Sequence, residues 1–192
     1  SADVFNVDEF NLPHTAGKAG GACTSALLKV MNEFKEEELS WLEVLQKMRT
    51  VLDDKGYDQI PQLSASRFLD ADDRSEIVPQ RAVYENTARR AVLIGINYTG
   101  QDGQLSGCQN DVENIKRFLI KEQGFHEKDL LILVDDGKHY APTRKNILDS
   151  FAKICQYSEA GDVVFVHYSG HGELMLLLLL LLKLSSCFII II

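Results

Sequence analysis

The stretch DVVFVHYSGHGE, residues 162–173, begins as an apolar run and ends in a histidine held between two glycines. Its first half does not alternate between apolar and polar residues, which is typical of a strand buried on both faces. Two earlier stretches have the same character, RRAVLIGINY (residues 89–98) and DLLILVDD (residues 129–136). We predict three buried strands, the first of them over residues 91–97.

Helix-forming patterns separate these predicted strands. Residues 110–124 carry apolar side chains at helical spacing up to a closing glycine, and residues 142–158 do so after Thr143, a suitable N-cap. Strands that alternate with helices form a parallel sheet with helices on both faces and right-handed crossovers. The predicted fold class is therefore α/β, built on a parallel sheet flanked by helices.

In such a sheet, ligands bind at the edge formed by the carboxyl ends of the strands. Here that edge collects Asn97 and Tyr98, then Asp135 and Asp136, then the segment 167–171. We expect Asp135 and Asp136 to be solvated loop carboxylates rather than metal ligands. A functional site is predicted at this edge.

His171 is the strongest candidate for chemistry, because an imidazole titrates near neutral pH and can pass a proton to a leaving group. Gly170 would let the backbone turn sharply after the strand, and Gly172 would leave an amide free to stabilise an oxyanion. The alternative is a histidine in a tight turn without a chemical role. His167 precedes His171 by four residues on a strand, so the pair does not predict a metal site.

The N-terminal half of the chain has a helical pattern. A helix is predicted over residues 22–34, and a second begins after Ser40, whose capping box with Glu43 marks the first turn, and ends at Gly56. Residues 1–16 lack a clear period and are expected to form an extended arm or a partly ordered lead-in. The apolar face predicted for the second helix consists of Leu42, Leu45, Met48, Val51 and Leu52.

A polar segment divides the two halves. Residues 70–89 are acidic at the front and interrupted by Pro79, which is typical of a linker. We therefore predict an N-terminal segment over residues 1–80, a linker over 81–88, the α/β domain over 89–173 and an apolar tail over 174–192.

Composition narrows the class of protein. The 192 residues are 45% hydrophobic and 25% charged with a net charge of −8, which argues against a sequence-independent nucleic-acid binder. No glycine-rich phosphate loop follows the first strand, so a nucleotide binder is improbable. No signal peptide is recognisable, and the four cysteines are far apart, which favours reduced thiols and a cytoplasmic location.

The motifs together resemble the large-subunit core of metacaspases, the caspase-like cysteine peptidases. The resemblance runs in order from Arg89 to Gly172 through RRAVLIGINY, LSGCQNDVENIKRFL, DLLILVDD, PTRKNIL and GDVVFVHYSGHG. GGACTSALL and MRTVLDDKGYDQIPQLSASR resemble the small subunit, which here precedes the large one, as in type III metacaspases of algae. The resemblance implies a caspase-like fold and a cysteine endopeptidase with a role in programmed cell death.

The resemblance also implies roles for single residues. His171 corresponds to the catalytic histidine, and Gly172 to the position whose amide helps to form the oxyanion hole. Cys108, Asp111 and Ser169 correspond to residues that line the pocket for the side chain before the cleaved bond. An acidic pocket implies peptide or protein substrates with Arg or Lys at that position. Calcium dependence is common in the family, but no calcium ligands are assigned in this chain. Membrane contact is expected only if the apolar tail is an anchor.

Two of these residues also have ordinary structural interpretations. Asp111 lies where a helix N-terminus favours negative charge, and Cys108 is a small apolar residue suited to a core. A non-catalytic caspase-like decoy or regulatory binding protein is the alternative function.

The nucleophile is not recognisable in the sequence. In caspases the cysteine follows the histidine by roughly 50 residues, which is beyond residue 192, and residues 174–192 are a run rich in leucine and isoleucine. We favour a junction artefact for this tail over a membrane anchor. A fourth strand with Cys187 as a displaced nucleophile is the third interpretation. We disfavour it because Cys187 follows His171 by only 16 positions, which leaves no room for the crossover that a parallel neighbour requires.

Overall fold

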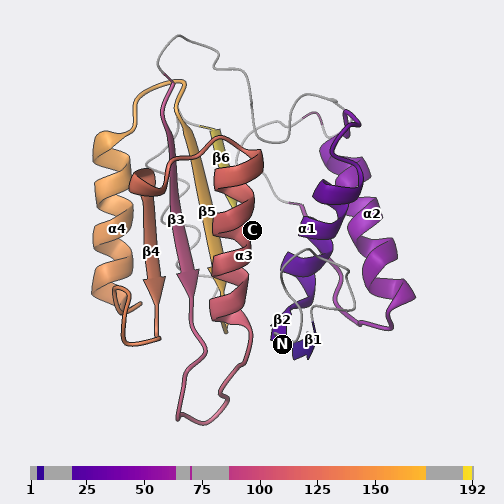
Figure 1. The fold of residues 1–192 in the computed structure, drawn as a ribbon, viewed down its shortest axis with the longest axis horizontal. Helices are drawn as coiled ribbons and strands as arrows, with labels where there is room; N and C mark the ends of the chain where they lie inside the picture. Colours follow the sequence, from indigo (N-terminus) through magenta and orange to yellow (C-terminus); the bar gives the residue numbers. More distant parts are fainter. Residues whose placement is uncertain (1–3, 7–18, 64–69, 71–86, 172–187, 192) are drawn as a thin grey trace.

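The computed structural model describes residues 4–6, 19–63, 70, 87–171 and 188–191. Its centre is a parallel sheet in the order β4-β3-β5-β6, with the strands running down the page in Figure 1. The fold class predicted from the sequence is therefore confirmed. The strands are β3 (Arg89–Gly95), β4 (Leu130–Val134), β5 (Val163–Ser169) and β6 (Phe188–Ile191).

One helix covers each face of this sheet. The helix α3 (Cys108–Glu122) leads through a short 3-10 turn, η2 (Glu127–Asp129), into β4, and α4 (Arg144–Tyr157) connects β4 to β5 on the other face. Alternate residues of β5 enter the two cores, with Phe165 packed on the α3 side and Val164 on the α4 side. As the sequence predicts, the side chain of Thr143 caps α4 by accepting a hydrogen bond from the Asn146 amide.

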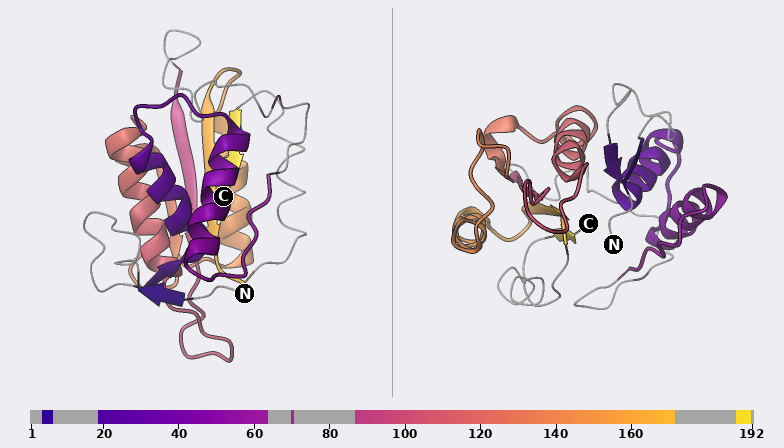
Figure 2. Two further views of the ribbon diagram at one scale, coloured as in Figure 1. Left: turned by 90° about the vertical axis from the view of Figure 1, so that its right-hand side faces the viewer. Right: turned by 90° about the horizontal axis from the view of Figure 1, so that it is seen from below.

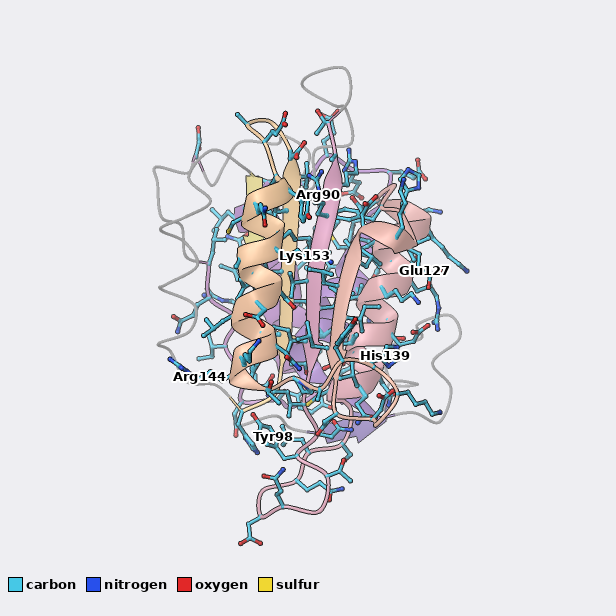
Figure 3. The ribbon with its side chains drawn as sticks, turned by 90° about the vertical axis from the view of Figure 1, so that its left-hand side faces the viewer. Arg90, Tyr98, Glu127, His139, Arg144 and Lys153 are labelled. Carbon is cyan, nitrogen blue, oxygen red and sulfur yellow. The ribbon has the colours of Figure 1, made fainter. Side chains whose placement is uncertain are left out.

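Opposite ends of the sheet have different chemistry. At the amino ends, Arg90 forms an ion pair with Asp162, whose carboxylate also accepts a hydrogen bond from the Ala88 amide. Tyr98 lies at the carboxyl ends, and Figure 3 shows it at the opposite end of the sheet from Arg90. An ion pair thus connects β3 to the residue before β5 at the amino ends of the strands. The polar residues that follow the strands lie at the carboxyl ends.

The N-terminal half packs beside α3. Strands β1 (Val4–Asn6) and β2 (Ala19–Gly21) pair antiparallel and lead into α1 (Ala22–Glu33) and α2 (Trp41–Asp54). The views in Figure 2 show α1 beside α3, with α2 on its outer side. Leu28 of α1 joins the core between α3 and the sheet, while α1 and α2 pack on each other around a cluster of their own. The N-terminal half therefore contributes to the core under α3.

The second helix is rotated slightly from the predicted face. Met48 and Leu52 are buried as predicted, but the third buried residue of α2 is Val44, and Leu42 and Leu45 are only half-buried. Apolar residues occupy a wide face of α2, and only the part of that face that packs against α1 is fully buried.

The capping box of α2 is present as predicted. The Glu43 amide donates to Ser40 Oγ (3.2 Å) and the Ser40 amide donates to Glu43 Oε2 (2.8 Å). Ser40→Ala should lower the free energy of unfolding by about 1 kcal/mol, because one orphan amide loses its acceptor. Chemical denaturation measures this change. Thr50→Ala is the matched control, because its hydroxyl only contacts the exposed Gln46 carbonyl, and an equal loss in both variants would contradict the capping role.

The end of the tail forms a strand, which corrects our expectation. Residues 188–191 pair in parallel with β5 from Val163↔Phe188 to Val166↔Ile191. A parallel crossover needs about a dozen residues, and residues 172–187 exceed that length, so our argument against a parallel neighbour was wrong. Phe188 lies beside the amino end of β5, about 20 Å of strand away from its carboxyl end.

Other expectations for the tail and the linker stay predictions. Cys187, the remainder of the tail before residue 188, and most of the linker lie outside the described residues. In the part of the chain that the structure describes, no helix has the length and apolar character of a bilayer span.

Candidate active site

The start of α3 is pressed against the end of β3, and this contact brings the predicted pocket residues together. A Cβ added to Gly95 would lie 2.6 Å from the Cys108 carbonyl oxygen, so only glycine allows this close approach. Asn97 Oδ1 accepts a hydrogen bond from the Cys108 amide (3.0 Å), which satisfies one free amide of the first turn. Residues in the first turn of α3 therefore face the end of β5.

Asp111 is at the centre of this contact and is completely buried. Its Oδ2 accepts a hydrogen bond from Ser169 Oγ (2.6 Å), and its Oδ1 accepts one from the Gly21 amide (2.8 Å). Burial raises the pKa of Asp111 to about 6, although both hydrogen bonds favour the ionised form. The carboxylate therefore links the end of β5 to β2 of the N-terminal half, and its two partners are neutral.

Cys108 lies beside Asp111 and Ser169. Its side chain is buried, and burial raises the pKa of its thiol while a hydrogen bond with Ser169 acts in the opposite direction. The Asp111 charge raises this pKa further. Cys108 is therefore held as a neutral thiol, which suits a pocket wall and not a nucleophile.

His171 is exposed beyond the end of β5 and is held by its ring. Its Nε2 lies 2.6 Å from the Gly103 carbonyl oxygen. Because a carbonyl oxygen only accepts hydrogen bonds, we assign the proton of the neutral imidazole to Nε2. Nδ1 is then the nitrogen that can accept a proton. The Tyr98 ring also contacts the imidazole, with centroids 4.9 Å apart and a tilt of 36°.

Tyr168 holds the main chain at the same place. Its hydroxyl donates to the His171 carbonyl oxygen (2.7 Å) and lies 3.2 Å from the Tyr98 hydroxyl. A Cβ on Gly170 would lie 2.9 Å from the Tyr168 hydroxyl. A side chain at position 170 would therefore displace the Tyr168 hydroxyl from its place, a reason for glycine that the sequence did not reveal.

The two acidic residues after β4 are not simply solvated. Asp135 is half-buried, and its carboxylate accepts hydrogen bonds from the Asn97 and Tyr98 amides and from Gln109 Nε2. Partial burial alone would raise the pKa of Asp135, but these hydrogen bonds outweigh it and lower the pKa. The expectation of a solvated carboxylate is wrong for this residue.

Asp136 is fastened within its own loop. It accepts hydrogen bonds from the Lys138 and His139 amides and pairs with His139 Nδ1 (2.8 Å), and these contacts lower its pKa to about 2. Among the described residues, no group of three or more His, Cys, Asp or Glu side chains is placed to hold a metal ion. The calcium dependence that the resemblance implies has no matching ligand set in this part of the chain.

His167 was assigned no role from the sequence, and the structure gives it one as a buried contact. Its Nε2 lies 3.3 Å from Thr24 Oγ1 of α1, and burial lowers the pKa of His167 to about 4. It is a neutral histidine that joins β5 to the N-terminal half.

Three of the four described candidates from the sequence, Cys108, Asp111 and Ser169, form one cluster, and His171 follows Ser169 at the same sheet edge. Gly172 lies outside the described residues. The hydrogen bonds and ring contact of His171 within the described residues involve Gly103, Tyr98 and Tyr168, and none of these is a thiol.

Comparisons with known proteins agree with this architecture. Residues 89–176 match the family described as metacaspase, peptidase C14 domain. Metacaspase III c of Phaeodactylum tricornutum is 47% identical over 176 residues, which are 90% of this chain and 51% of that protein. Metacaspase-7 of Arabidopsis thaliana is 46% identical over 86 residues, 44% of this chain and 21% of that protein.

The chain thus spans about half the length of the Phaeodactylum relative and a smaller share of the Arabidopsis one. The first match extends over both halves of the chain in the same order. The C14 match covers β3, β4 and β5 and the residues at their carboxyl edge, and β6 lies beyond it. The chain belongs to the metacaspase family.

Proposed function

We propose that the protein is a cysteine endopeptidase that cleaves peptide bonds after Arg or Lys, with His171 as its general acid and base. The observation that carries this proposal is the Nε2 contact of His171 with the Gly103 carbonyl. It leaves Nδ1 as the proton acceptor on an exposed ring at the carboxyl edge of the sheet, where a substrate can reach it.

The chemical step follows from this arrangement. A cysteine thiol gives its proton to His171 Nδ1, and the sulfur attacks the peptide carbonyl carbon. The C–N bond then breaks, the leaving amine takes the proton from His171, and an acyl-enzyme remains that water hydrolyses. Burial raises the pKa of the Cys108 and Cys23 thiols, and Cys155 packs against the core on the α4 side. The described contacts of His171 include none of these three thiols, so we place the nucleophile outside the described residues.

The preference for a basic side chain rests on Asp111. Its two hydrogen-bond donors, Gly21 and Ser169, are neutral, so among the described residues the ionised carboxylate has no cationic partner. A guanidinium or ammonium group would provide that charge, and a carboxylate would be repelled. An acidic substrate residue is therefore disfavoured at this position. Calcium dependence and a cytoplasmic location remain proposals that follow from the family resemblance.

The test is cleavage of fluorogenic peptides with Arg, Lys or Asp before the cleaved bond, each with calcium and with EDTA. The genomic sequence after the Gly172 codon is read first, because another reading frame there could encode the cysteine segment. The 192-residue chain and the product that includes any such segment are then assayed side by side. We expect cleavage of the Arg and Lys peptides at least tenfold faster than of the Asp peptide, in whichever form carries the nucleophile. Binding of these peptides without cleavage in both forms would favour the regulatory alternative.

A further inference from the structure

Tyr98 adopts a backbone conformation that few residues with a side chain adopt. Its φ is +54°, and it is the only non-glycine residue with a positive φ in the described part of the chain. This region is disfavoured because Cβ approaches the neighbouring backbone. A strained residue at the edge of a candidate active site must be held by its surroundings.

Asp135 supplies that support from the end of β4. Its Oδ2 accepts a hydrogen bond from the Tyr98 amide (2.8 Å), and its Oδ1 accepts one from the Asn97 amide (3.0 Å). Gln109 Nε2 of α3 also donates to Oδ1 (3.0 Å), which fixes the carboxylate itself. The backbone at residues 97–98 is therefore held by a carboxylate that β4 and α3 position together.

The result of this conformation is a tyrosine ring against His171. The ring centroids are 4.9 Å apart, and the Tyr98 hydroxyl lies 3.2 Å from the Tyr168 hydroxyl, which donates to the His171 carbonyl. The Gly103 carbonyl accepts a hydrogen bond from Nε2 of the same imidazole. The imidazole is exposed, so without these contacts it would be free to rotate about its side-chain bonds.

We propose that Tyr98 is a positioning residue for His171, and that Asp135 acts through Tyr98 by holding it in its strained conformation. The inference rests on the proposed role of His171 as general acid and base. The Tyr98 ring covers one face of the imidazole and keeps Nε2 directed at Gly103, so that Nδ1 is presented to the reacting atoms before substrate binds. The loop that carries Tyr98 also contains Gly103, so one segment sets both contacts.

The two parts of the proposal can be separated by substitution. Tyr98→Gly keeps a residue that tolerates a positive φ, so the loop is retained and only the ring is lost. Tyr98→Phe keeps the ring and loses only the hydroxyl. Asp135→Ala keeps Tyr98 but removes the acceptor for its amide. Tyr140→Gly is the matched control: Tyr140 is a 78% exposed tyrosine that follows β4, and its described contact with β4, a bridge to Leu133, is made by the backbone, which glycine keeps.

The measurement is the tautomer of His171 in the 15N-labelled chain, read from two-bond 1H–15N correlation spectra with His171→Gln as the assignment control. We expect the neutral ring to be protonated at Nε2 alone in the wild type, in Tyr98→Phe and in Tyr140→Gly. Tyr98→Gly and Asp135→Ala should show both tautomers in exchange. An unchanged tautomer in Tyr98→Gly, or an equal change in Tyr98→Phe, would overturn the proposal.

A kinetic readout applies to the form of the protein that cleaves peptides. Tyr98→Gly should lower kcat by about ten- to a hundredfold with KM unchanged, because misplacing a catalytic group affects the chemical step. Tyr98→Phe should stay within about threefold of the wild type. A raised KM with an unchanged kcat in Tyr98→Gly would contradict the proposal that Tyr98 positions His171. If no form cleaves peptides, the proposed function fails, while the tautomer still decides whether Tyr98 positions His171.

Discussion

Replacing His171 with alanine is expected to lower kcat/KM for peptides with Arg or Lys before the cleaved bond by about 10²- to 10⁴-fold. The alanine variant lacks the base that accepts the thiol proton and the acid that protonates the leaving amine. Because His171 is exposed, its loss should change the free energy of unfolding by only about 0.5 kcal/mol. Steady-state kinetics and thermal unfolding together distinguish lost chemistry from lost folding.

The matched control is His126→Ala. His126 is also exposed, but it precedes η2 and the amino end of β4 and therefore does not lie at the carboxyl edge of the sheet. It should leave kcat/KM within about twofold of the wild type, as surface substitutions usually do. Cleavage that persists in His171→Ala would show that the imidazole isn't the acid or base, and our mechanism would be wrong. A parallel Cys187→Ala variant should keep full activity, because Phe188 pairs with Val163 at the amino end of β5, opposite to His171.

The strands and helices of the large-subunit core were predictable because each carries a strong local pattern. β5 and β4 are apolar runs bounded by polar residues, and the hydroxyl cap of α4 was visible in the sequence. The ends of β3 were shifted: the strand covers Arg89–Gly95, two residues earlier than predicted. Asn97 leaves the strand because its amide donates to Asp135 instead of to a neighbouring strand.

What could not be predicted depends on contacts between distant segments. No local pattern joins Gly21 to Asp111, which are 90 residues apart, or Thr24 to His167, which are 143 apart. For the contact between Gly21 and Asp111, the resemblance singled out Asp111, and the GGACTSALL motif was the signal that drew attention to the segment with Gly21. Likewise, the strain at Tyr98 arises from Asp135, which is 37 residues away.

Asp111 and His167 are expected to give the stability of the protein opposite dependences on pH. The pKa of Asp111 is raised from 3.8 to about 6, so the folded chain binds the extra proton and loses stability as pH rises from about 4 to 6. The pKa of His167 is lowered from 6.5 to about 4, so the unfolded chain binds the proton and stability is lost as pH falls through the same range. The two slopes should largely cancel in the wild type.

Asp111→Asn should expose the histidine slope alone. Asparagine keeps the shape of the side chain and can still accept from the Gly21 amide while donating to Ser169 Oγ, but it cannot ionise. We expect the free energy of unfolding to rise by about 3 kcal/mol at pH 7 relative to the wild type, and to increase steeply with pH between about 4 and 6.5. Urea denaturation at a series of pH values measures both effects.

Two variants make this result decisive. His167→Gln should show the reverse slope, with stability falling as pH rises from about 4 to 6, because Asp111 then titrates alone. Asp102→Asn, in the exposed loop before α3, should follow the wild-type curve.

The lowered pKa values of Asp135, Asp136 and Asp162 affect stability only below about pH 4, outside this window. If Asp111→Asn is no more stable than the wild type at pH 7, the ionised carboxylate does not destabilise the folded protein, and the description of Asp111 as a buried charge with two neutral partners would be wrong.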